Sequence, residues 1–158
     1  MKVATIKKPT FEDAQKLSSF YTTIESKTVL YNKLSNILNL DYIESLSGLN
    51  VHEIYNYILL KYYPNETSIK SSFINRVLMN GEKHVTIFEL PLINSRADLC
   101  KINGDSIVYE IKTELDNFSR LTKQIDDYKK IFDKIYVICP IRKINHIKKY
   151  IPVDTGIY

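Results

Sequence analysis

Three charged side chains lie on two neighbouring segments that otherwise favour strand structure. Asp98 stands in "RADLCKI", and Glu110 and Lys112 stand in "SIVYEIKT". Because side chains alternate along a strand, Glu110 and Lys112 share one face. Two carboxylates held close together repel each other unless a cation lies between them, and Mg²⁺ prefers carboxylate oxygens and water as ligands. A lysine beside such an ion can orient an attacking water and stabilise charge on a phosphate transition state, so these residue types are suited to phosphodiester hydrolysis.

The turn between the two segments decides whether Asp98 joins that face. Asn103-Gly104 is a hairpin signal. A two-residue loop places Asp98 on the face of Tyr109, whereas a three-residue loop places it on the face of Glu110. Only the odd loop collects the apolar residues of both strands on one continuous face. We therefore predict an odd loop, with Gly104 in the left-handed conformation, and the convergence of two acids and one lysine.

The remaining pattern predicts an α/β protein. Residues 1–64 have apolar residues at helical spacing and predict a helical N-terminal extension that ends at Pro64. Asn65 is suited to cap a further helix, in which Ile69, Phe73, Ile74 and Val77 form an apolar stripe. Beyond residue 85 the period changes to that of strands, and three strands are followed by a helix at 117–132, an apolar strand at 134–140 and a last helix.

The string "YEIKTELDNFSRLTKQIDDYKKIF" places Gln124 and Tyr128 on the helix that follows the charged strands. This order resembles the PD-(D/E)XK nuclease superfamily, in particular its RecB-like branch and a family of small bacterial and phage proteins assigned to it. The resemblance runs from about Val51 to Cys139, although Ala97 replaces the proline of the motif. It implies a restriction-endonuclease-like core at residues 65–158, with a mixed central sheet flanked by helices in αβββαβ order.

The resemblance also implies roles for individual residues in a metal-dependent nuclease that hydrolyses DNA. Asp98 and Glu110 would bind Mg²⁺ or Mn²⁺, with Glu66 completing the metal shell and Glu89 as the lower-ranked alternative. Lys112 would be the catalytic lysine. Gln124 would contact the site or the substrate from the following helix.

Basic residues gather near the C-terminus. From Lys129 to Tyr150 there are seven basic residues and one acid, in a chain of net charge +4. Such a segment can attract the phosphates of nucleic acid, although a solvated helix face gives the same pattern. The residues expected to contact DNA are Arg120, Lys129, Lys130, Arg142 and Lys143.

Composition excludes several other classes. No apolar run approaches the ~20 residues that span a bilayer, and no signal peptide is apparent. Two cysteines suggest neither a disulfide framework nor a zinc site, so we expect a cytoplasmic protein. Four glycines leave no phosphate-binding loop. The alternatives to an active nuclease are an inactive relative that binds nucleic acid or protein, and an inhibitor or defence component whose N-terminal helices bind an unidentified partner.

Overall fold

The computed structural model describes residues 6–22, 24–79 and 83–158. It divides into two compact units, Met1–Ser72 and Phe73–Tyr158. This division falls within the helix after Pro64, whereas the sequence placed the boundary in front of that helix. Each unit is described by itself.

The N-terminal unit is helical. Its helices are α1 (Phe11–Phe20), α2 (Lys27–Ile37), α3 (Leu40–Glu44), α4 (Val51–Tyr62) and α5 (Glu66–Phe73), which runs into the C-terminal unit. Side chains cap their first turns: Thr10 and Asn50 form capping boxes with Asp13 and Glu53, which satisfies backbone N–H groups that have no partner inside the helix. The core is a cluster of buried apolar side chains from α1 to α4 that includes Leu17, Leu34, Tyr55 and Ile58.

A π-helical turn, Ile74–Leu78, continues the helix α5. The amide of Met79 donates to the carbonyl of Ile74, five residues earlier, at 2.9 Å. A π turn holds more residues than an α turn, so the side chains beyond it are rotated about the helix axis. Within the turn, Val77, predicted to be part of the apolar stripe, is 37% exposed, and Leu78 is buried at 2% exposure.

The C-terminal unit contains one five-stranded sheet in the order β1-β2-β3-β4-β5. The first three strands, β1 (Val85–Pro91), β2 (Arg96–Asn103) and β3 (Asp105–Ile111), are antiparallel neighbours. Strands β4 (Lys134–Ile138) and β5 (Gly156–Ile157) add in parallel. Each parallel connection contains a helix, α6 (Leu121–Tyr128) or α7 (Ile144–Ile147), as parallel strands require a crossover. A short 3₁₀ turn, Ile141–Lys143, precedes α7.

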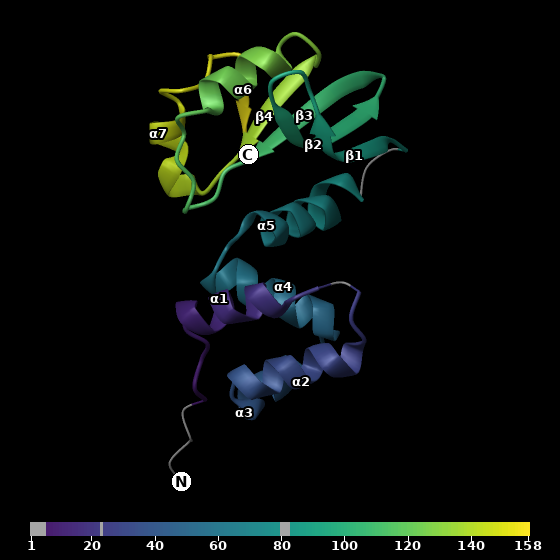
Figure 1. Cartoon of the computed structure of the whole chain (residues 1–158), viewed down its shortest axis with the longest axis vertical. Helices are drawn as coiled ribbons and strands as arrows, with labels where there is room; N and C mark the ends of the chain where they lie inside the picture. The colour runs from purple at the N-terminus through teal and green to yellow at the C-terminus, as the bar shows by residue number, and fades with distance from the viewer. Residues whose placement is uncertain (1–5, 23, 80–82) are drawn as a thin grey trace. The chain divides into compact units, whose positions relative to one another are not determined.

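Helix α6 lies against one face of this sheet (Figure 1). Its fully buried residues Leu121, Ile125 and Tyr128 recur at helical spacing and pack with Cys100, Val108 and Val137 of the strands. The opposite face is aromatic. The rings of Tyr109 and Tyr136 stack with centroids 5.5 Å apart, and Phe73 and Tyr158 pack beside them.

The described elements confirm the α/β class and the mixed sheet. The order from α5 to β4 is helix, three strands, helix and strand, and β5 adds an edge strand from the segment "VDTGIY". Gly156 in β5 lies under the Tyr136 ring, and a Cβ atom there would overlap the ring carbons. The edge strand can therefore approach β4 only with glycine at this position.

Candidate nucleic-acid interface

The β2–β3 hairpin places the three predicted charged residues on one face of the sheet. Leu99 pairs with Tyr109 and Asn103 pairs with Asp105, and Gly104 between them has a φ angle of +75°. This register is odd, as predicted, and it sets Asp98 opposite Glu110. The convergence of Asp98, Glu110 and Lys112 is confirmed, and α6 covers that face.

Glu110 is the centre of a closed hydrogen-bond network. Only 1% of this residue is exposed. Its Oε1 atom accepts from Lys112 Nζ at 2.8 Å and from Gln124 Nε2 at 2.7 Å, and its Oε2 atom accepts from the Tyr128 hydroxyl at 2.6 Å. The Gln124 amide oxygen in turn accepts from Lys112 Nζ at 3.2 Å. The buried charge is therefore neutralised by one lysine and bound by three donors.

Tyr128 contributes a polar group that its place on an apolar helix face did not reveal. The hydroxyl has one proton and two acceptors, Glu110 Oε2 at 2.6 Å and the carbonyl of Arg96 at 2.9 Å. Because the carboxylate is charged and nearer, it is the stronger acceptor. Burial, followed by the negative charge of Glu110, raises the pKa of Tyr128 far above its ordinary range. The hydroxyl therefore stays protonated and serves as a permanent donor.

Asp98 is bound to the backbone of the neighbouring strand. Its Oδ2 atom accepts from the amide of Ile111 at 2.7 Å, and the residue is 9% exposed. Burial, with a contribution from the Asp98 charge, raises the pKa of the Cys100 thiol to about 11. Cys100 is thus an inert thiol in the core, in agreement with the sequence.

The two acids considered for a third metal ligand have other partners. Glu66 belongs to the N-terminal unit, where it forms an ion pair with Lys70 at 3.0 Å. Glu89 lies in β1 at a φ of +52°, uncommon for a residue with a side chain, and pairs with Arg96 Nε at 2.9 Å. The carboxylate of Glu110 does not fit Mg²⁺ as it stands, because both oxygens already accept from side-chain donors and Lys112 neutralises the charge. The divalent ion therefore stays a prediction, and no chemistry is assigned to it.

Most basic residues predicted to contact DNA have an acceptor within the protein. Lys129 binds both oxygens of Asp154 at 3.0 Å, and Lys130 binds Asp127 at 3.1 Å. Arg142 pairs with Glu114 at 2.6 Å, although its side chain is 76% exposed. The pairs of Lys129 and Arg142 are exposed, so they are weak and can open for a competing phosphate, whereas Asp127, the partner of Lys130, is only 8% exposed.

Lys143 has a structural role in this unit. Its ammonium donates to the carbonyls of Thr113, Glu114 and Asp116 at 3.3, 2.5 and 3.4 Å, and it lies 5.1 Å from the centre of the Phe118 ring. One lysine thereby fastens the loop that leads into α6. The sequence separation of about 30 residues hid this role from local pattern analysis.

Several exposed cations form no ion pair with any residue in the part of the chain that the structure describes. Four of them lie on or beside α6 and just beyond α7: Arg120, Lys123, Lys148 and Lys149. We call this set the cationic face. Its two segments lie side by side, because the Thr122 hydroxyl donates to the carbonyl of Tyr150 at 2.9 Å. Only Arg120 was named as a DNA contact from the sequence. The excess of basic residues near the C-terminus was the signal that could have identified Lys148 and Lys149.

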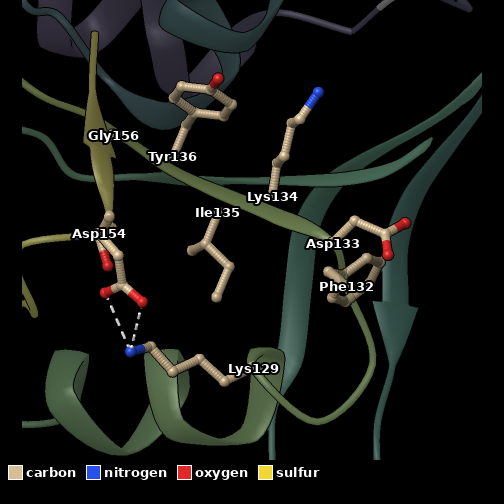
Figure 2. A pocket seen from close by; sticks show the side chains of 9 residues that line it. Lys129, Phe132, Asp133, Lys134, Ile135, Tyr136, Asp154 and Gly156 are labelled. Atoms are coloured by element: carbon tan, nitrogen blue, oxygen red, sulfur yellow. Dashed lines mark hydrogen bonds and ion pairs between the residues drawn. The ribbon is translucent and has the colours of Figure 1, made fainter.

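A hollow of about 460 Å³ lies where β5 begins beside β4 (Figure 2). Lys129 and Lys134 line it together with Asp133 and Asp154, so its charges balance. The Asp133 carboxylate accepts from the amide and the hydroxyl of Ser106, both at 2.7 Å, and these hydrogen bonds lower its pKa. With its charges satisfied locally, this hollow offers less attraction to phosphate than the cationic face.

No described helix is long and apolar enough to cross a membrane.

Comparison with known proteins indicates the family. Residues 61–158 match the family described as Bacteriophage P4 protein cII. A segment of 62 residues is 32% identical to "Protein cII" of Enterobacteria phage P4. The aligned segment covers 39% of this chain and 24% of that protein. The match thus spans about a quarter of the length of that relative. No solved structure matches the chain significantly.

These matches correct the interpretation drawn from the charged strands. From residue 61 onward, the family match covers the segment in which the PD-(D/E)XK, RecB-like resemblance was found, and it points to the P4 protein cII family instead. The assignment to a nuclease superfamily, and with it a DNA-hydrolysing enzyme, was wrong. The physical reason for the error is that an acid, an acid and a lysine on adjacent strands also make a self-satisfying buried network. The association with phage proteins is consistent with the match.

Proposed function

The chain belongs to the bacteriophage P4 protein cII family, and on this premise we propose that it is a non-enzymatic protein whose C-terminal unit binds nucleic acid, DNA in the first instance. The observation that carries the proposal is the cationic face. Its four positive charges project into solvent without forming an ion pair among the described residues, on two segments that a hydrogen bond holds together. The proposed partner implies a cytoplasmic location.

The energetics of exposed charge support binding through phosphates. An unpaired lysine or arginine at the surface adds nothing to folding stability, and neighbouring like charges repel. The same charges release counterions when they meet phosphates, which favours binding to nucleic acid. Arg142, whose exposed pair with Glu114 can open, adds a further cation near this surface.

The polar network around Glu110 supports a binding protein rather than a catalyst. A general base or a nucleophile needs a free position facing the substrate. Here the carboxylate oxygens of Glu110 accept from Lys112, Gln124 and Tyr128, and the residue is 1% exposed. We assign this network to the stability of the sheet and α6.

The test is the salt dependence of DNA binding. In fluorescence anisotropy titrations with a labelled DNA, replacing Arg120, Lys123, Lys148 and Lys149 together by glutamine should weaken binding at low salt. It should also reduce the slope of log affinity against log salt by about 0.9 for each lost phosphate contact. Each replacement should change the free energy of unfolding by no more than about 0.5 kcal/mol, because these side chains are exposed.

The matched control removes the same number of positive charges from the N-terminal unit. Lys7, Lys8, Lys16 and Lys27 are exposed lysines of the N-terminal unit, and their joint replacement by glutamine lowers the net charge equally. We expect this control to keep most of the affinity and the salt slope. Equal losses in the two variants would show attraction by net charge alone, and a wild-type chain without measurable DNA affinity would end the proposal.

A further inference from the structure

A second hollow opens beside the cationic face, between the loop before α6 and the helix α7. Its volume is about 600 Å³, within the ~300–1,000 Å³ range of small-molecule sites. Three rings line it: Phe118 on the loop, His146 on α7 and Tyr150 just beyond. Phe118 is 5% exposed and is a fixed part of the wall, whereas His146 is exposed and Tyr150 half-buried.

The three rings form a compact cluster. The Phe118 ring centre lies 5.3 Å from that of His146 and 5.8 Å from that of Tyr150, and His146 and Tyr150 are 5.3 Å apart. Their planes are inclined to one another by 51° to 61°. The rings therefore do not stack on one another face to face. The inclined arrangement leaves the exposed His146 ring at the edge of the hollow.

Three charged side chains line the hollow, Asp116, Lys143 and Arg142, and each has a partner within the protein; that of Arg142 is Glu114, in an exposed pair that can open. The Asp116 carboxylate accepts from the amide and the hydroxyl of Thr113 at 2.6 and 2.7 Å. The Lys143 ammonium is bound to backbone carbonyls, as described above. The hollow thus offers aromatic surface with one exposed cation, Arg142, in its lining, and the unpaired cations lie beside it on the cationic face.

We propose that this hollow receives one unstacked nucleobase, so that the chain prefers single-stranded over double-stranded nucleic acid. The inference rests on the proposed function and assigns it a substrate class. Every base has a π-face that stacks on aromatic side chains, and a backbone leaving the hollow meets cations within the same surface. Bases in a duplex are stacked on their neighbours and cannot enter without being unpaired.

The test compares a single strand and its duplex, each carrying 2-aminopurine, a base analogue whose fluorescence falls when it stacks. The wild-type chain should bind the single strand more tightly and quench its fluorescence. Tyr150→Leu should weaken single-strand binding about tenfold and reduce the quenching, with little change for the duplex. His146→Leu should also weaken single-strand binding and reduce the quenching.

Two variants separate stacking from folding. Tyr150→Phe keeps the ring and should bind as the wild type does, which excludes a general effect of substitution at this site. Tyr31→Leu removes an exposed tyrosine of the N-terminal unit and should leave binding unchanged. Melting curves of all variants identify any loss of folded protein, and His146→Leu, at an exposed position, provides the test if Tyr150→Leu does not fold.

The outcomes distinguish this inference from the function on which it rests. Equal affinity for strand and duplex, with no effect of Tyr150→Leu or His146→Leu, overturns the nucleobase site and leaves phosphate binding intact. The absence of binding to either nucleic acid overturns both. Loss of affinity in Tyr150→Leu without any change in 2-aminopurine fluorescence also contradicts the base site.

Discussion

The network around Glu110 and the cationic face show two ways in which one unit uses charge. In the network, two opposite charges lie within 2.8 Å of each other and under a helix, with each carboxylate oxygen occupied by a donor. On the cationic face, four positive charges lie in solvent and form no ion pair with any described residue. The first arrangement is costly to disturb and offers nothing to a ligand. The second adds nothing to folding and is available for binding, so the location of unpaired charge indicates function better than the presence of charged residues.

Removal of the central carboxylate should break the comparison most severely. Glu110→Ala leaves Lys112, 12% exposed, with a buried and uncompensated charge. It also removes the acceptor of Gln124 Nε2 and the stronger of the two acceptors of the Tyr128 hydroxyl. We expect the free energy of unfolding to fall by about 3–5 kcal/mol, measured by urea denaturation. The control is Glu114→Ala, which breaks the exposed pair with Arg142 and should cost less than about 1 kcal/mol. Similar losses of stability for both variants would contradict the distinction between the buried network and the exposed ion pairs.

A smaller effect is expected at the edge of the network. Tyr128→Phe removes only the hydroxyl, which leaves Glu110 Oε2 and the Arg96 carbonyl without this donor. The expected loss is about 1–3 kcal/mol in urea denaturation. Tyr31→Phe, at an exposed tyrosine, should be neutral. If Tyr128→Phe were equally neutral, the hydroxyl would have no structural role and the network would end at Gln124.

The smallest effect concerns two lysine–aspartate pairs next to the cationic face. Hydrogen bonds from Ser95 and Lys130 lower the pKa of Asp127, and a hydrogen bond from Lys129 lowers that of Asp154. An aspartate with a lowered pKa adds stability above its ordinary value of 3.8 and loses it as the pH falls through the lowered value. The contribution of these two aspartates to the urea midpoint should therefore stay constant from neutral pH down to about 4 and fall at lower pH. Asp127→Asn should be less stable at neutral pH and should show a smaller decline in acid; an unchanged acid decline would assign it to other carboxylates.

The sequence predicted the parts of this unit that depend on local periodicity. Strand alternation, the Asn103-Gly104 turn and the apolar pattern were sufficient to place Asp98 opposite Glu110. Asn65 caps α5 as expected, with its side-chain oxygen accepting from the amide of Ser68 at 2.9 Å. These are interactions between residues close in the chain, for which residue type determines geometry.

Side-chain partners between distant segments were beyond the sequence. Tyr128 was placed on the helix after the charged strands, but its hydroxyl meets Glu110 only because the fold brings α6 against β3. Lys143 was predicted to bind DNA, but its ammonium is held by carbonyls some 30 residues earlier. A charged residue has the same appearance in a sequence whether or not tertiary structure supplies its partner. This is why three converging charges were mistaken for a catalytic site.

The π-helical turn at Ile74–Leu78 has a consequence for changes in chain length. Such a turn contains one residue more than an α-helical turn, so this stretch holds a surplus residue within a continuous helix. A deletion of one residue here could close the turn with ordinary α-helical hydrogen bonds and still bury Leu78, whereas a deletion elsewhere in the helix would rotate the following side chains by about 100°. The helix is therefore tolerant of shortening at this one turn.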